Sequence, residues 1–127
     1  PVACAAGLAV LDVVRDEGLQ EHALEVGNQI VAVLRMMMEE HKLIGDVRGS
    51  GLFLGVELVK DRATREPAPA EAKHVVNRLR DLGVLTGTDG PHENVIKLRP
   101  PLVLTQEDAD LFLSAFDQVL REDRLKV

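Results

Sequence analysis

Hydrophobic positions along the chain recur at intervals that predict four helices around a small sheet. The first helix, Pro1 to Arg15, has a proline in its first turn and Gly18 just past its end, a common arrangement. A helix that is hydrophobic on every side is normally buried on every side, so we expect a body outside this segment to cover it. The alternative is an alanine-rich helix with a broad core face. The apolar positions run almost all the way round: Val2, Ala3, Ala6, Leu8, Val10, Leu11, Val13 and Val14.

The second helix, Leu19 to Glu40, has one apolar stripe and charged residues on its other faces. Steps of three and four residues are typical of a helix that buries one side. The stripe lasts barely two heptads, so packing against a sheet is favoured over a coiled coil. Its members are Ala23, Val26, Ile30, Val33 and Met37.

The centre of the chain predicts a short strand from Ile44, a turn at residues 49–51 and a second strand, Leu52 to Val59. Only Gly55 and Glu57 interrupt the apolar run of the second strand. A strand covered on both faces shows such a run, whereas a half-buried strand alternates. We therefore expect a central strand with elements packed on both sides, and glycines in the turn that admit another backbone. A plain buried hairpin is the simpler interpretation.

Charges and prolines in residues 60–70 predict an exposed loop without regular structure. A third helix follows from Glu71 and ends at Gly83. Residues 84–86 are expected to form a short strand, and residues 87–94 a turn-rich connection.

The last strand, Val95 to Arg99, alternates strictly, and Pro100 and Pro101 end it because proline has no N–H for the ladder. Thr105, followed three residues later by Asp108, resembles a capping box at the start of the fourth helix. We expect this helix to bury Ala109, Phe112, Phe116 and Val119 and to fray into a charged tail after Leu120.

Composition narrows the class of protein. The chain has 127 residues and 13.9 kDa, which is enough for one core. A net charge of −6 argues against nucleic-acid binding. The sequence contains no window of about 18 apolar residues, so a membrane span is not expected. The single cysteine, Cys4, cannot form an internal disulfide, so a reducing, cytoplasmic location is expected. The chain begins with proline and not methionine, so we expect it to be part of a longer protein.

Lys97 and Arg99 are the strongest candidates for chemistry. They lie on the same face of one strand, about 6–7 Å apart along it, beside a glycine-rich loop. Two fixed cations suit a carboxylate or a phosphate; the alternative is that they protect a strand edge against mispairing. No catalytic set is evident, and the four histidines have no partners at metal-ligand spacing, so no metal site is expected.

Three blocks carry a family resemblance: PVACAAGLAVLDVV, DVRGSGLFLGVELV and IKLRPPLVLT, in that order. Together they resemble the C-terminal part of class III pyridoxal-phosphate-dependent aminotransferases, along essentially the whole chain. ELVKD, PAPAEAKHVV and DGPHENVIKLRPPLVLTQEDAD are similar to one branch in particular. This branch contains ethanolamine-phosphate and phosphohydroxylysine phospho-lyases, grouped with alanine–glyoxylate aminotransferase-2-like proteins.

The resemblance implies an α/β (α+β) fold, the small C-terminal domain of a fold-type-I transferase, with a mainly antiparallel sheet of three to four strands covered by helices. Residues 1–18 would be the helix leading from a large domain, and residues 19–127 the small domain. Pyridoxal 5'-phosphate would be bound mainly by the large domain, in a homodimer or higher homo-oligomer. The lysines of this chain lie outside the family's Schiff-base context, which implies no catalytic residue here; they are Lys42, Lys60, Lys73, Lys97 and Lys126.

The implied reaction is transfer of an amino group from an amino acid or ω-amine to a 2-oxo acid. Many members have arginine at the position of Lys97, where it pairs with the substrate carboxylate, so Lys97 and Arg99 are the expected substrate-binding residues. Lysine at this position resembles the phospho-lyase branch, and elimination of phosphate from a phosphorylated amine is the alternative. Arg48 and Gly49 match a turn that we interpret as structural. A non-catalytic anion-binding or dimerisation module is the remaining hypothesis.

Overall fold

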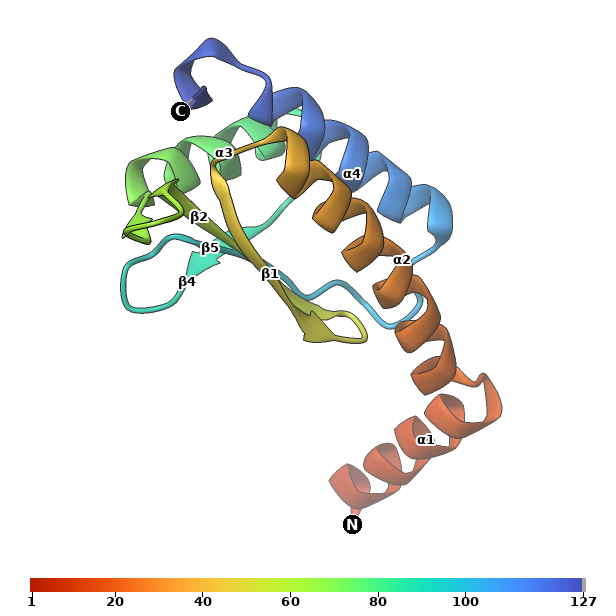
Figure 1. The fold of residues 1–127 in the computed structure, drawn as a ribbon. Helices are drawn as coiled ribbons and strands as arrows, with labels where there is room; N and C mark the ends of the chain where they lie inside the picture. The colour runs from red at the N-terminus through yellow and green to blue at the C-terminus, as the bar shows by residue number, and fades with distance from the viewer. Residues whose placement is uncertain (127) are drawn as a thin grey trace.

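The computed structural model describes residues 1–126 and shows one helical layer on one face of an antiparallel sheet (Figure 1). Helices α2 (Leu19–Glu40), α3 (Pro69–Asp81) and α4 (Gln106–Leu120) form the layer, while α1 (Val2–Asp16) projects away from it. The four expected helices are therefore confirmed. None of the described helices has the length and apolar character needed to cross a membrane.

The sheet has the strand order β1-β2-β5-β4, with every neighbouring pair antiparallel. A further two-residue strand, β3 (Glu66–Pro67), pairs with the end of β2. The other strands are β1 (Ile44–Ser50), β2 (Phe53–Asp61), β4 (Gly87–Asp89) and β5 (Val95–Leu98). This arrangement confirms the predicted mixed fold with a small antiparallel sheet.

The hydrophobic core lies between the three helices and one face of the sheet. β2 and β5 each place alternate residues on this face, because successive side chains of a strand point to opposite sides. The buried residues of β2 and β5 on this face are Leu54, Val56, Leu58, Ile96 and Leu98. The helices cover them with residues that include Ala23, Val26, Ile30, Leu34, Val75, Leu79, Ala109, Leu113, Phe116 and Val119. In α2 the deepest residue is Leu34, and the predicted stripe members Val33 and Met37 are only partly buried.

The prediction that β2 is covered on both faces is wrong for the described residues. β2 is central in the sheet, since it pairs with β1 and β5, but its second face is open from Phe53 to Glu57. Phe53 on this face is 62% exposed, and Glu57 is only half-buried. The apolar run includes two residues with the parity of this face, Phe53, which is exposed, and Val59, which is buried where β3 pairs with the end of β2.

Glycines join α2 to the β1–β2 turn. A Cβ added to Gly27 of α2 would lie 2.0 Å from the carbonyl oxygen of Gly51, so the helix and the turn are in backbone contact. Gly49 has a φ of 132°, and a Cβ there would lie 2.2 Å from the carbonyl oxygen of Phe53. The expectation that this turn admits another backbone is confirmed.

Three local predictions need correction. The segment 60–70 contains β3 and the start of α3 at Pro69, because proline fits the first turn of a helix. Residues 84–86 precede the strand, which is β4 at residues 87–89. The chain after α4 does not fray at once: a 3₁₀ turn, η1 (Asp123–Leu125), returns Leu125 to the core at 2% exposure. The capping box of Thr105 and Asp108 is confirmed.

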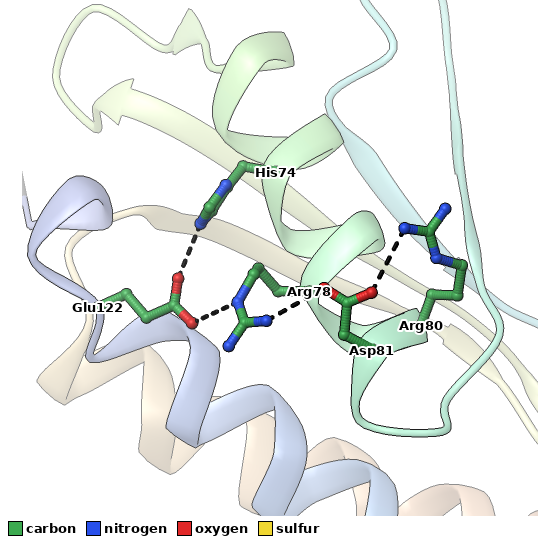
Figure 2. Close-up of polar contacts among 5 residues, drawn as sticks. All are labelled: His74, Arg78, Arg80, Asp81 and Glu122. Carbon is green, nitrogen blue, oxygen red and sulfur yellow. Dashed lines mark hydrogen bonds and ion pairs between the residues drawn. The ribbon is translucent and has the colours of Figure 1, made fainter.

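A polar cluster ties α3 to the residue just beyond α4. His74 and Arg78 extend from α3 toward Glu122, whose two carboxylate oxygens each lie 2.8 Å from one of them (Figure 2). Arg78 also donates to Asp81 at 3.1 Å. The hydrogen bonds from Arg78 and then from His74 lower the pKa of Glu122. This cluster holds α3 and the end of α4 together on the helical side of the sheet.

Helix α1 buries almost none of its apolar surface against the rest of the chain. None of its residues is buried, and its exposed fraction reaches 84% at Val2 and 65% at Leu11. Gly18, with a φ of 63°, turns the chain from α1 into α2. The apolar pattern of α1 predicts full burial, but residues 19–126 leave this helix uncovered.

Candidate anion-binding site on the open face of the sheet

The open face of the sheet carries the side chain of Lys97. Ile96 and Leu98 on either side of it in β5 are buried against the helices, so alternation places Lys97 on the opposite face. Its side chain is 35% exposed. The predicted strand therefore presents this cation away from the core, as the alternation of its residues indicated.

Both strands beside Lys97 contribute a glycine at the position directly opposite it. In the register of the sheet, Lys97 pairs with Gly55 of β2 and with Gly87 of β4. Directly opposite residues of antiparallel strands have Cβ atoms about 4.5–5.5 Å apart on the same face. Glycine has no Cβ, so no cross-strand side chain stands beside the base of Lys97. A lysine between two glycines is accessible to a molecule that approaches the open face.

Asp89 holds the ammonium of Lys97. The Nζ of Lys97 donates to Oδ2 of Asp89 at 2.8 Å, and the N–H of Gly90 donates to Oδ1 at 2.8 Å. These two hydrogen bonds, followed by the charges of Lys97 and Arg99, lower the pKa of Asp89. The Asp89 carboxylate accepts hydrogen bonds from an ammonium and from a backbone N–H. An anion is therefore stabilised beside Lys97.

Arg99 follows β5 and is exposed. Within residues 1–126 it forms no ion pair, although its charge reaches Asp89. The two expected cations thus lie close enough together for both charges to act on Asp89. One is already in an ion pair and the other is available.

A groove of about 440 Å³ adjoins the end of β5 on the helical side. Its wall is mostly apolar, with Lys97, Arg99 and Asp108 among the lining residues. Apolar contributors include Ile30, Leu52, Leu54, Leu85, Leu104 and Phe112. The basic pair therefore stands where the open face of the sheet meets an apolar groove.

Arg48 forms a second charged group on the open face. Its Nη1 donates to Glu57 at 2.6 Å and to Asp46 at 2.8 Å, across β1 and β2. The hydrogen bond that this guanidinium donates to Asp46, and then the one that it donates to Glu57, raise the pKa of Arg48. The sequence places Arg48 only in a turn, and its cross-strand partner Glu57 stands out there only as a polar break in an apolar run.

Folding also brings together a cluster that sequence spacing did not reveal. One ligand atom from each of Glu40, His41 and Asp117 lies within 4.8 Å of the others. The guanidinium of Arg121 donates to Asp117 at 2.7 Å and to Glu40 at 2.9 Å. His41 contacts Asp117 at 2.8 Å. The arginine supplies the positive charge among these carboxylates, so the cluster joins α2 to α4 by ion pairs.

The family model for class-III aminotransferases matches residues 1–120. The chain is 48% identical over 116 residues to a mitochondrial alanine–glyoxylate aminotransferase 2 homolog of Arabidopsis thaliana, which covers 91% of this chain and 24% of that protein. It is 46% identical over 121 residues to ethanolamine-phosphate phospho-lyase homolog 1 of Caenorhabditis elegans, covering 94% of this chain and 26% of that protein.

Solved structures agree with these relatives. A phospholyase from Arthrobacter in complex with phosphoethanolamine superposes with a TM-score of 0.91 at 40% identity, over 96% of this chain and 29% of that one. An amine transaminase from an uncultivated Pseudomonas species, in its pyridoxal-phosphate-bound form, gives 0.83 at 41% identity, over 92% and 26%. The chain spans about a quarter of the length of the curated relatives it matches. It belongs to the class-III aminotransferase family.

Proposed function

We propose that the whole protein is a pyridoxal-phosphate-dependent aminotransferase that transfers an amino group from an amino acid or ω-amine to a 2-oxo acid. Family membership supports the reaction class, and the exposed ammonium of Lys97 between Gly55 and Gly87 supports a role for this chain in binding the substrate's anionic group. Pyridoxal 5'-phosphate serves as an electron sink in such reactions.

The residues of this chain do not fit the task of holding that cofactor covalently. A lysine that reacts as an amine is usually desolvated, which lowers its pKa. Four of the five lysines are exposed and Lys97 is only half-buried in an ion pair with Asp89; the exposed four are Lys42, Lys60, Lys73 and Lys126. The reactive lysine and most of the cofactor's contacts are therefore expected in the remaining part of the protein.

Within this proposal, residues 1–18 connect a large domain to the small domain of residues 19–127. The uncovered apolar surface of α1 supports a contact with that larger body. Gly7 adds to this support, because glycine weakens a helix interior and, apart from its own helix, nothing in residues 1–126 lies within 4 Å of a Cβ placed there. Another backbone could approach α1 closely at this point. A homodimer or higher homo-oligomer in the cytoplasm is part of the same proposal, with no nucleic-acid or membrane partner.

Elimination of phosphate from a phosphorylated amine is the second candidate. It is favoured by lysine at position 97, a point charge suited to phosphate, whereas the planar fork of arginine matches a carboxylate. The similarity to a phospholyase bound to phosphoethanolamine supports it as well.

One assay on the full-length protein with its cofactor separates the two reactions. Phosphoethanolamine is added and inorganic phosphate is measured, while alanine is paired with glyoxylate to measure amino transfer. Amino transfer without phosphate release supports the aminotransferase, and phosphate release without amino transfer replaces it with the lyase. Absence of both reactions and of cofactor absorbance would leave a non-catalytic anion-binding or dimerisation module.

A further inference from the structure

At eight of the ten glycines, the structure of this chain explains why the residue is glycine. Five have a positive φ, which other residues rarely adopt, and three lie where a Cβ would come within 3.0 Å of a neighbour. The first set is Gly18, Gly49, Gly51, Gly83 and Gly90; the second is Gly27, Gly45 and Gly55. The two that remain are Gly7 and Gly87. Neither has a positive φ, and among residues 1–126 no atom beyond the adjacent backbone lies within 4 Å of an added Cβ.

Gly87 is the more informative of the two because of what lies opposite. It pairs directly with Lys97, so a side chain at position 87 would stand on the same face as the ammonium-bearing chain. Glycine weakens a strand, and neither the backbone nor the packing of this chain requires it there. The space beside Lys97 on the β4 side is therefore available to something outside the chain.

The charges at this place indicate what could fill that space. A lysine ammonium has three N–H donors, and Asp89 accepts from Lys97 at Oδ2, leaving donors for another acceptor. Arg99 adds a second positive charge close enough to influence Asp89. A net positive site with open space suits an anionic group.

We propose that Gly87 is a specificity-determining residue: its missing side chain leaves the space in which the substrate's anionic group binds beside Lys97. The inference rests on the proposed function, because it assumes that Lys97 binds the anionic end of the amine substrate. It goes further by assigning the neighbouring strand β4, and not β5 alone, to substrate selection.

The test uses the full-length protein with its cofactor and the variants Gly87→Ala and Gly87→Val. KM and kcat are measured with phosphoethanolamine and with β-alanine, two amines that end in a phosphate and a carboxylate. Each added carbon should raise KM, by about tenfold for Gly87→Ala and further for Gly87→Val, with kcat within about twofold of the parent. The melting temperature should not fall, because glycine weakens a strand. Thr88→Ser, on the opposite face of β4, should alter none of these values.

Two outcomes would overturn the inference. An unchanged KM for both amines in Gly87→Val means that the space is not used by substrate, and loss of folded or assembled protein in Gly87→Ala means that another part of the protein fills it. Lys97→Ala, measured alongside, separates this failure from that of the proposed function. A raised KM in Lys97→Ala with an unchanged KM in Gly87→Val rejects the role of Gly87 alone. An unchanged KM in both variants rejects the binding role of Lys97 as well.

Discussion

The two faces of the sheet are built from the same strands but differ in what their residues contact. On the covered face, Val56, Leu58 and Ile96 are fully buried by helices of this chain. On the open face, Phe53, Gly55 and Lys97 have no helix over them within residues 1–126. The covered face forms the core of this chain, whereas the open face carries an exposed ring and charged pairs in place of a core.

This difference explains how one strand can give a misleading pattern. An apolar run usually indicates burial on both sides, and β2 has such a run. Phe53 and Gly55 on its open face are apolar or small although no helix of residues 1–126 covers them, so they are available to a ligand or to another part of the protein. A side chain that needs an outside partner is therefore recognised by comparing its residue type with its exposure in the chain.

Truncation of one phenylalanine on each face is expected to give the largest contrast. Phe116→Ala removes a fully buried ring from the core and should lower the free energy of unfolding of the 127-residue chain by about 3–5 kcal/mol. Phe53→Ala removes a ring that is 62% exposed and should cost less than about 1 kcal/mol. Urea titration followed by circular dichroism measures both. Equal losses would show that the open face is covered by the chain itself.

Two helix glycines provide the next contrast. Gly27→Ala places a carbon 2.0 Å from the carbonyl oxygen of Gly51, so the helix or the turn must shift, at a cost of about 1–3 kcal/mol. Gly7→Ala meets nothing within 4 Å and should be neutral or gain up to about 1 kcal/mol from better helix propensity. Thermal unfolding of the 127-residue chain compares them. A stable Gly27→Ala variant would contradict the close contact between α2 and the turn.

Sequence alone predicted most of the covered face and part of the open one. Periodicity located the helices and the alternation of β5, because local burial determines both. It did not reveal that Gly55 and Gly87 flank Lys97, since strand register depends on contacts distant in sequence. Nor did it show the pairing of Lys97 with Asp89, eight residues apart, because residues 87–94 were expected to form a turn-rich connection and the strand was placed at residues 84–86.

The function of the open face is tested by removing its cation. In the full-length protein, Lys97→Ala should raise KM for an anion-bearing amine by about tenfold to a hundredfold, as expected when a hydrogen bond to a charged group is lost. Arg99→Ala should have a smaller effect, because this residue lies beyond the end of β5. Lys60→Ala serves as the matched control, since Lys60 is also ion-paired on the surface, with Glu66. An equal effect of Lys60→Ala would indicate a general charge effect and not a site.

The smallest expected effect is on stability at acid pH, and it compares Glu122 in the helical layer with Asp89 on the open face. Arg78 and then His74 lower the pKa of Glu122, so its folded-state pKa lies below its unfolded value. Ionised Glu122 therefore contributes stability at neutral pH, and this contribution is lost as the pH falls below about 4.3 through the folded pKa. Glu122→Gln should be less stable than the parent at pH 7, and the difference should shrink toward pH 3. Urea midpoints of the 127-residue chain at both values give the measurement.

Asp89 on the open face also has a lowered pKa, chiefly because of Lys97. Its pair joins the half-buried Lys97 to an exposed carboxylate at the edge of the sheet, and pairs that reach solvent contribute little because solvent screens them. Asp89→Asn should therefore change the urea midpoint less than Glu122→Gln does at pH 7, while Glu122 links two helices of the layer. If Asp89→Asn lowers the urea midpoint more than Glu122→Gln does, the Lys97–Asp89 pair holds β4 in the fold. The Asp89 carboxylate then has a structural role beyond its position beside Lys97.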